Sequence, residues 1–284
     1  MDSKIILITG GTGGIGLETA KALAMQGAQI IVAGRSAERG AAAVEIIATH
    51  AGHDRVRYIQ ADLTRMDDTV TLARQIDRLD VLINNAGGLY GERHVTPDGF
   101  EASLAINHLA PFLLTHHLLD RLQASAPARI VNVSSVAHRA VRVQLDNLQA
   151  EHWDNGVAVY GRSKLVNLLV GYEHARQLEG SGVTLNFADP ASADTEMTRQ
   201  LTRRFLPPLI GRLLFLKRFI AGSPARSARS SIYLATAPAA AGQQGLYVTP
   251  RLKAVRSAPA SYDPGLGRRL YAETEAMLRP WLTL

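Results

Sequence analysis

Short apolar runs alternate along the chain with longer segments in which apolar residues recur at helical spacing. The runs are rich in Val, Ile and Leu without strict alternation, as expected for strands that are buried on both faces of a sheet. Strands are predicted at Lys4–Thr9, Ile30–Arg35, Val56–Asp62, Asp80–Asn85, Ala128–Ser134, Val183–Ala188 and Gly245–Val248. Helices are predicted between them, for example at Gly16–Gln26, Gly99–Ala124 and Val157–Glu179. This order predicts an α/β fold with a doubly wound parallel sheet of about seven strands and helices on both faces.

A single domain over residues 1–284 is the simplest organisation, because no internal repeat or low-complexity segment interrupts the alternation. A chain of 284 residues, 46% of them hydrophobic, can bury one large core. No uncharged apolar run reaches about 18 residues, so we expect no membrane span. We also expect no signal peptide, because the chain enters a strand pattern (KIILIT) almost at once. Cysteine is absent, which excludes thiolate metal sites and disulfides, and a cytoplasmic location is the default expectation.

A glycine-rich loop follows the first predicted strand and opens a helix, in the stretch ITGGTGGIG that ends at Gly16. In this context the loop predicts a dinucleotide site, because a side chain would block the turn and the approach of the pyrophosphate. The helix start at Ile15-Gly16 offers free backbone N–H groups to the phosphates. Two spacings fit the loop. Gly10, Gly14 and Gly16 read as GxxxGxG, whereas Gly10, Gly13 and Gly16 read as GxxGxxG.

The end of the second predicted strand indicates which dinucleotide is bound. Sites that prefer NAD place a carboxylate here on the ribose 2′-hydroxyl, but this strand ends in Gly34, Arg35 and Ser36. A guanidinium next to a hydroxyl suits a 2′-phosphate, so we predict NADP(H) as the cofactor. The alternative is that Arg35 is an ordinary exposed residue at the entry to a helix.

Two further strand ends carry candidate cofactor contacts. Asp62-Leu63 closes the third strand, where the carboxylate could accept a hydrogen bond from the adenine amino group or could instead cap the next helix. The sequence Asn84-Asn85-Ala86-Gly87 closes the fourth strand, and its small residues would let the nicotinamide half of the cofactor lie against the backbone. All these positions are carboxyl ends of parallel strands, where open α/β sheets bind ligands.

Candidate catalytic residues come next, in the sequence Tyr160-Gly161-Arg162-Ser163-Lys164. The spacing places the Tyr160 phenol and the Lys164 ammonium on one face of a helix, where the cation is expected to lower the tyrosine pKa. Such a tyrosine can give a proton to a carbonyl oxygen or take one from an alcohol. A serine hydroxyl from Ser134-Ser135 could bind the substrate oxygen, and Asn107 could hold a water that relays protons to Lys164.

Five motifs in this order, TGGTGGIG, NNAG, INHLAPFLLT, RIVNVSSVAH and YGRSK, closely resemble the short-chain dehydrogenase/reductases, and the resemblance covers nearly the whole chain. It implies a Rossmann-type fold and a catalytic tetrad of Asn107, Ser135, Tyr160 and Lys164. Ser135 is preferred over Ser134 because the family serine is usually the second of the pair. The NNAG motif and the short chain after the sixth strand favour the GxxxGxG spacing over the GxxGxxG of the sugar-nucleotide branch.

Three segments resemble the retinol dehydrogenase and WW-domain oxidoreductase-like branch, namely NHLAPFLLT, RIVNVSSVAH and SPARSARSSIYLAT. So does the interval of 25 residues between the catalytic serine and tyrosine. This resemblance implies NADP(H) and a lipophilic aldehyde, ketone or alcohol as the substrate. It also implies a homodimer or homotetramer, with the two long helices at the interface.

The chain departs from the branch after the sixth strand. Where the branch reads His-Pro-Gly, this chain has Asp189, Pro190 and Ala191, followed by Thr195, which would touch the nicotinamide carboxamide. Alanine in place of glycine is a mild change unless this residue needs a positive φ. The two extra carboxylates, Asp189 and Asp194, could reflect a polar group on the substrate or could have no functional role.

The C-terminal third is basic. Residues 195–284 carry 14 Lys and Arg against 4 Asp and Glu, whereas residues 1–194 carry 17 against 21. A solvated basic surface is the favoured interpretation, and nucleic acid is not expected because no nucleic-acid motif accompanies the charge. Within this third, residues 201–220 mix Leu, Ile and Phe with five Lys and Arg. They are interpreted as part of a C-terminal substrate lid over about residues 194–222, with weak contact to a membrane surface as the alternative.

The complete prediction is an NADP(H)-dependent oxidoreductase that acts on a lipophilic ketone or aldehyde, or on the matching alcohol. Its expected role in the cell is that of a ketoreductase. No metal is expected, since the nine histidines show no ligand spacing. The alternatives are a non-catalytic NADP(H)-binding protein and, less favoured, a sugar-nucleotide epimerase. The predicted cofactor-binding residues are Gly10, Thr12, Gly14, Ile15, Gly16, Arg35, Ser36, Asp62, Leu63, Asn85, Ala86, Gly87, Tyr160, Lys164, Pro190 and Thr195.

Overall fold

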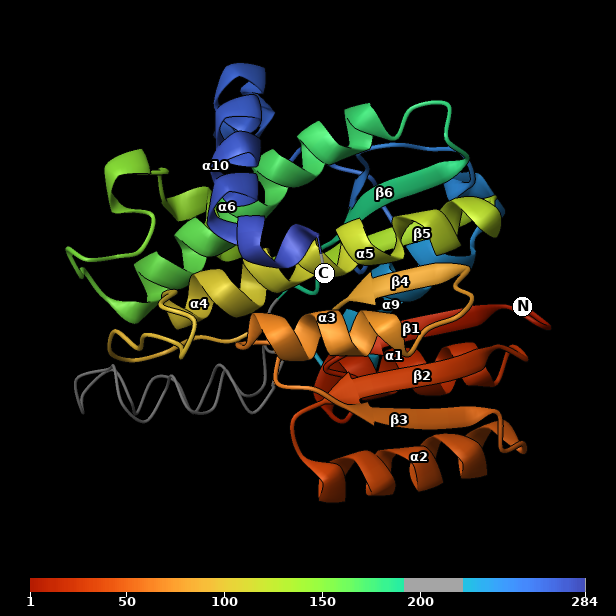
Figure 1. Ribbon diagram of the computed structural model, residues 1–284. Coiled ribbons are helices and arrows are strands. Elements are labelled where there is room, and N and C mark those ends of the chain that lie inside the picture. Colours follow the sequence, from red (N-terminus) through yellow and green to blue (C-terminus); the bar gives the residue numbers. More distant parts are fainter. Residues whose placement is uncertain (192–221, 284) are drawn as a thin grey trace.

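A computed structural model describes residues 1–191 and 222–283 of the chain. Its centre is a seven-stranded sheet in the order β3-β2-β1-β4-β5-β6-β7, and every neighbouring pair is parallel (Figure 1). The strands are β1 (Ile5–Thr9), β2 (Gln29–Gly34), β3 (Val56–Gln60), β4 (Val81–Asn84), β5 (Ala128–Val133), β6 (Val183–Ala188) and β7 (Tyr247–Val248). The predicted fold class is therefore confirmed. The predicted strands extend one or two residues too far at several ends, and the last has only two paired residues.

Helices connect successive strands, as the alternating pattern predicted. They are α1 (Gly14–Ala24), α2 (Ala37–Ala51), α3 (Met66–Arg74), α4 (Ala102–Leu104), α5 (Ala110–Ala124), α6 (Gly156–Gln177), α9 (Pro224–Thr236) and α10 (Pro264–Leu282). Polar side chains cap several of them. Ser36 accepts a hydrogen bond from Arg39 N at the start of α2, and Asn155 accepts one from Ala158 N at the start of α6. Such caps satisfy N–H groups that have no partner within the helix, which fixes where each helix begins.

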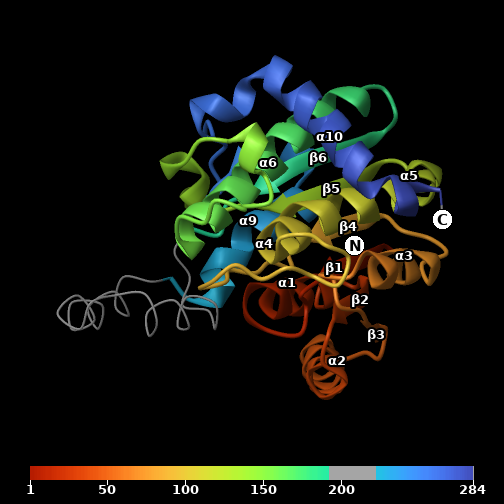
Figure 2. The ribbon, with the colours of Figure 1, turned by 60° about the vertical axis from the view of Figure 1, so that its left-hand side comes forward.

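Helices cover both faces of the sheet (Figures 1 and 2), and an apolar layer lies between the strands and the helices on each face. On one face, strand residues such as Leu7 and Leu185 pack against α3, α5 and α6. On the other face, strand residues such as Ile8 and Val131 pack against α1, α2 and α9. The strands are thus buried on both sides, which explains why their sequences are continuous apolar runs.

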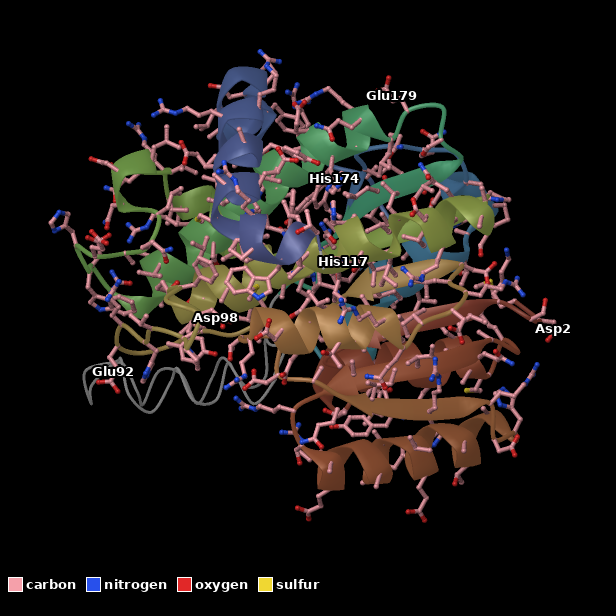
Figure 3. All side chains as sticks on the ribbon, in the orientation of Figure 1. Asp2, Glu92, Asp98, His117, His174 and Glu179 are labelled. Carbon is pink, nitrogen blue, oxygen red and sulfur yellow. The ribbon has the colours of Figure 1, made fainter. Side chains whose placement is uncertain are left out.

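The C-terminal helix α10 forms an additional layer outside α5 and α6. Its Leu270 and Leu278 are buried against residues of those two helices. His117 on α5 contacts the Trp281 carbonyl oxygen at 2.8 Å, and the His174 ring on α6 lies 5.4 Å from the Tyr271 ring (Figure 3). Part of the outward face of the two long helices is therefore covered within the chain itself.

The segment interpreted as a lid, about 194–222, lies outside the described residues except for its last position, and Thr195 lies outside them as well. Within residues 1–191 and 222–283, none of the helices combines the length and the apolar content that a membrane crossing needs.

Candidate active site

The glycine-rich loop turns sharply between β1 and α1. Gly10 has φ +65° and Gly14 has φ +53°, a left-handed backbone that favours glycine. Gly16 lies against the start of the loop, so a Cβ at this position would stand 2.3 Å from the Gly10 carbonyl oxygen. A Cβ at Gly13 would meet only the tip of the Arg39 side chain, at 2.6 Å from Nη2. The backbone thus requires glycine at the three positions of the GxxxGxG spacing.

Asn85 and Thr9 hold this loop against the end of β4. The Asn85 amide donates to the carbonyl oxygens of Thr9 at 2.8 Å and Gly10 at 3.3 Å. The Thr9 hydroxyl accepts hydrogen bonds from the N–H groups of Asn85 and Ala86, both at 3.0 Å. The Asn85 side chain therefore shapes the loop, and Ala86 and Gly87 continue from it along the carboxyl edge of the sheet.

Two arginines lie at the adenosine end of the loop. Arg35 is exposed directly after β2, and Ser36 forms the N-cap of α2. Arg39 lies in the first turn of α2, and its side chain extends back to Gly13. A Cβ at Gly13 would stand 2.6 Å from Arg39 Nη2. Thr12 lies beside Gly34, since a Cβ at Gly34 would stand 3.2 Å from the Thr12 hydroxyl. Arg39 was not among the residues predicted from the sequence, although it follows Arg35 by only four residues.

Asp62 takes part in the turn that leads from β3 to α3. Its Oδ1 accepts hydrogen bonds from the N–H of Thr64 at 3.0 Å and from its hydroxyl at 2.8 Å. The neighbouring Leu63 is buried in the core beneath α3 and α5. Asp62 does not cap α3, whose N-cap is Arg65, but one of its carboxylate oxygens stabilises the turn before the helix. The contact with adenine stays a prediction.

Tyr160 and Lys164 lie one turn apart on α6. The Lys164 side chain is only 4% exposed. Its Nζ donates to the Val133 carbonyl oxygen at 2.8 Å and stands 5.9 Å from the centre of the Tyr160 ring. Burial lowers the pKa of Lys164 to about 8. This contact fixes the ammonium group at the end of β5, beside the residues predicted to be catalytic.

The pKa of Tyr160 is raised, not lowered. Burial is the main cause, and the Asp189 charge adds to it, whereas a hydrogen bond with Ser135 acts in the opposite direction. Lys164 does not offset these effects because its ammonium group is directed to the Val133 carbonyl oxygen. The expectation that Lys164 lowers the Tyr160 pKa is therefore wrong for this structure.

The Ser134–Ser135 pair divides its roles at the end of β5. Ser134 is buried, and its N–H donates to the Ala188 carbonyl oxygen at 2.8 Å, which continues the pairing with β6. Ser135 hydrogen-bonds Tyr160 and also accepts from Ala137 N at 3.3 Å. His138 secures this position, because its Nδ1 contacts the Ser135 carbonyl oxygen and its Nε2 accepts from Ala258 N at 3.0 Å. Nδ1 therefore carries the ring proton.

Asn107 lies on a π-helical turn, Ala105–Leu109, between α4 and α5. Such turns occur often at functional sites because they displace a side chain from the regular helical path. The Asn107 amide donates to the Gly88 carbonyl oxygen at 2.8 Å and to the Ser163 hydroxyl at 3.0 Å. Its Oδ1 accepts from Gly88 N at 3.1 Å. Three hydrogen bonds thus hold the Asn107 side chain. The bond to Ser163 links it to the α6 turn that carries Tyr160, because the Ser163 hydroxyl donates in turn to the Tyr160 carbonyl oxygen at 2.8 Å.

A family model described as short chain dehydrogenase matches residues 4–204, which is more than half of the chain. The chain belongs to the short-chain dehydrogenase family. Its members are oxidoreductases that act on CH–OH and C=O groups with a nicotinamide cofactor. The matched residues include the glycine loop and Asn107, Ser135, Tyr160 and Lys164.

The curated relatives indicate a particular branch of this family. The chain is 38% identical to human retinol dehydrogenase 13, over 97% of this chain and 84% of that protein. It is also 38% identical to human retinol dehydrogenase 11, over 83% of this chain and 73% of that protein. The predicted retinol dehydrogenase-like branch is therefore confirmed.

Solved structures agree with the family. An uncharacterized protein from Mycobacterium paratuberculosis superposes with a TM-score of 0.79 and 30% identity, covering 98% of this chain and 94% of that one. The NADP active-site complex of RhlG from Pseudomonas aeruginosa superposes with a TM-score of 0.70 and 26% identity, covering 88% and 96%.

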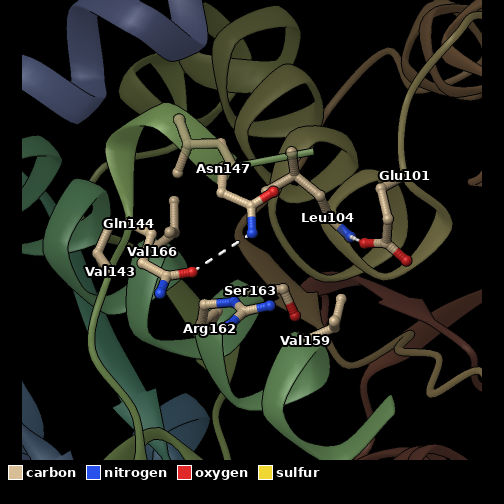
Figure 4. Close-up of a pocket in the computed structure, with 10 residues that line it drawn as sticks. Glu101, Leu104, Val143, Gln144, Asn147, Val159, Arg162, Ser163 and Val166 are labelled. Carbon is tan, nitrogen blue, oxygen red and sulfur yellow. Dashed lines mark hydrogen bonds between the residues drawn. The ribbon is translucent and has the colours of Figure 1, made fainter. Parts of the chain in front are cut away.

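Two cavities among the described residues lie away from the edge of the sheet that carries Tyr160 and the glycine loop. A cavity of about 10 Å³ lies behind α6, between Glu101, Asn147 and Arg162 (Figure 4). This volume suits a single water molecule and is too small for a carbonyl substrate. A cavity of about 440 Å³ lies among residues at the amino ends of the strands, including Lys4 and Asp80. Short-chain dehydrogenases, like other open α/β sheets, bind ligands at the opposite, carboxyl edge.

The turn after β6 contains both departures from the family pattern. Asp189 is buried, and Ala191 is exposed with φ +55°. The substitution of glycine by alanine is therefore not mild at this position, because Ala191 adopts a left-handed conformation that favours glycine. Pro190 lies between them at the carboxyl edge, as predicted from the motif.

Proposed function

We propose that this protein is an NADP(H)-dependent reductase of lipophilic ketones or aldehydes, with oxidation of the matching alcohols as the reverse reaction. The observation that carries the proposal is the grouping of Tyr160, Ser135 and Lys164 at the same edge of the sheet as the glycine loop. The names of the retinol dehydrogenase relatives support a lipophilic alcohol or carbonyl substrate.

Each catalytic side chain has a role that follows from its contacts. The nicotinamide cofactor, when bound, supplies or accepts the hydride. Tyr160 gives a proton to the substrate oxygen, since a tyrosine phenol is protonated at neutral pH. Ser135, which already hydrogen-bonds Tyr160, orients the same oxygen. Lys164 would contact the nicotinamide ribose when the cofactor is bound, and Asn107 would support the relay of protons to Lys164.

Arg35 and Arg39 support NADP(H) over NAD(H). Arg35 directly follows β2, and the Arg39 guanidinium lies beside Gly13 of the glycine loop. Two cations beside one 2′-phosphate would bind it more strongly than either alone. The structure of RhlG with NADP supports this choice by similarity.

Replacing Arg35 with aspartate tests the cofactor assignment. We expect the ratio of NADPH to NADH affinity to fall by about tenfold or more in Arg35→Asp, because the new carboxylate repels the 2′-phosphate and accepts from the NADH 2′-hydroxyl. The control is Arg55→Asp, which makes the same charge change at an exposed residue before β3. An Arg35→Asp protein that kept its preference for NADPH would contradict the assignment of Arg35 to the 2′-phosphate of NADP(H).

Several further predictions belong to the same proposal. They are a homodimer or homotetramer, a cytoplasmic location, no binding of nucleic acid, and a lid over about residues 194–222 with weak membrane-surface contact through 201–220 as the alternative. Sedimentation with anionic liposomes at physiological salt measures that contact. Tight NADPH binding without turnover of any carbonyl substrate would instead favour a non-catalytic cofactor-binding protein.

A further inference from the structure

Asp189 follows β6 directly and is one of the buried carboxylates of the described chain, with 4% of its surface exposed. Its Oδ2 accepts a hydrogen bond from the Tyr247 hydroxyl at 2.9 Å, and its Oδ1 accepts one from Ala191 N at 2.7 Å. Its carbonyl oxygen accepts from the Ser230 hydroxyl of α9 at 2.8 Å. A buried carboxylate with hydrogen-bond donors on both oxygens is fixed in one orientation.

Ala191 depends on this orientation. A left-handed conformation is unfavourable for a residue with a Cβ, whereas glycine adopts it without this cost. The bond from Ala191 N back to the Asp189 side chain, two residues earlier, is the type of contact by which aspartate stabilises a turn. The two residues that depart from the His-Pro-Gly pattern are therefore joined by a hydrogen bond.

We propose that Asp189 is a positioning residue that holds Ala191 in its left-handed conformation and ties the turn 189–191 to β7 through Tyr247, so that the two departures act as one unit. This inference rests on the proposed function for its link to the cofactor, because Pro190 and the backbone around it lie at the nicotinamide side of the predicted site. The coupling between Asp189 and Ala191 does not depend on that link.

The buried carboxylate also places a negative charge among the groups of the catalytic edge. The titratable groups that face this region are Tyr247 on β7, His138 and Arg139 of the turn after β5, and Tyr160 on α6. On α9 the facing side chain is the uncharged Ser230. The Asp189 charge raises the pKa of Tyr160 and of Tyr247, in both cases in addition to burial.

Chemical unfolding of four proteins without cofactor tests the coupling. They are the wild type, Asp189→Ala, Ala191→Gly and the double variant. We expect Asp189→Ala to lower the folding equilibrium constant by about tenfold in the wild-type background. In the Ala191→Gly background the same substitution should lower this constant by about threefold or less. Glycine needs no side-chain bond to hold a positive φ. Equal losses in the two backgrounds would overturn the coupling, whether or not the protein is a reductase.

Asp189→Asn separates the charge from the hydrogen bond, because asparagine keeps a side-chain oxygen for Ala191 N. We expect the Tyr160 titration to move to lower pH by about half a unit or more, while the NADPH affinity stays within about threefold. Absorbance titration of the tyrosinate, with Tyr160→Phe as the reference, measures this without turnover. The matched control is Tyr247→Phe, which removes the hydrogen bond but keeps the charge, and should leave the Tyr160 titration in place. An unchanged titration in Asp189→Asn would show that Asp189 acts on the backbone alone and would overturn its effect on Tyr160.

Discussion

Substituting Gly16 with alanine would place a methyl group inside the turn that joins β1 to α1. Its carbon would stand 2.3 Å from the Gly10 carbonyl oxygen, 2.5 Å from Asn85 Nδ2 and 2.9 Å from the Gly10 carbonyl carbon. Two of these atoms belong to the backbone and cannot rotate away. The loop must therefore move, and with it the N–H groups that are predicted to bind the pyrophosphate.

Two effects of opposite sign set the magnitude. Overpacking of this kind costs about 1–3 kcal/mol. Alanine in a helix is favoured over glycine by about 1 kcal/mol, and Gly16 lies in the first turn of α1. We therefore expect the free energy of unfolding to fall by no more than about 2 kcal/mol. The helix preference does not restore the loop geometry, so NADPH affinity should fall by about 5- to 150-fold.

The matched control is Gly13→Ala. Its Cβ would meet only Arg39, whose exposed side chain can move away. We expect less than about a fivefold loss of NADPH affinity, with the loss larger for NADPH than for NADH if Arg39 binds the 2′-phosphate. Isothermal titration of both cofactors, with urea unfolding of each variant, gives all the quantities. A Gly13→Ala protein that loses as much affinity as Gly16→Ala would refute the GxxxGxG interpretation.

Three further predictions follow from buried groups. Burial lowers the pKa of His108 to about 3, below the value of about 6.5 in an unfolded chain, so the unfolded state takes up the proton first and stability should fall as the pH falls from about 6.5 towards 3. Urea unfolding at pH 7 and pH 5 should show this loss, and His108→Gln, which can keep the contact with Thr274, should reduce it. Because burial lowers the pKa of Lys164 to about 8, kcat/KM for carbonyl reduction should fall as the pH rises through about 8. A profile that stays level to pH 10 would show that the ammonium charge is not required. Ser163→Ala removes an acceptor from the Asn107 amide, so kcat should fall by about fivefold with little change in the KM for NADPH, and an equal change in both would indicate a general structural effect.

The sequence was sufficient to predict the architecture, and the edge of the sheet at which the candidate site residues lie, because these depend on local signals. Apolar runs define doubly buried strands, and a glycine loop after the first strand marks the carboxyl edge where Tyr160, Ser135 and Asn107 were expected. The strand ends were less accurate, since pairing with neighbours decides where a strand stops. The last strand, β7, pairs with β6 through only two residues.

The features that escaped prediction depend on contacts between distant segments. Nothing local shows that α10 lies on α5 and α6, or that Lys164 is directed to the Val133 carbonyl oxygen. The predicted direction of the Tyr160 pKa shift was wrong for the same reason. The spacing of residues on a helix shows that a cation is near, but it does not show how deeply the phenol is buried. The left-handed conformation of Ala191 could be suspected from the missing glycine, yet its bond to Asp189 needed the structure.

The most direct test of the central claim is the oxidation of NADPH by the wild type and by Tyr160→Phe, with a panel of lipophilic aldehydes and ketones. Phenylalanine keeps the ring and removes only the hydroxyl. We predict turnover by the wild type that falls by about 10²–10⁴-fold in Tyr160→Phe, with NADPH affinity retained. Equal turnover by the two proteins would contradict the role of Tyr160 as the proton donor and, with it, the reductase assignment.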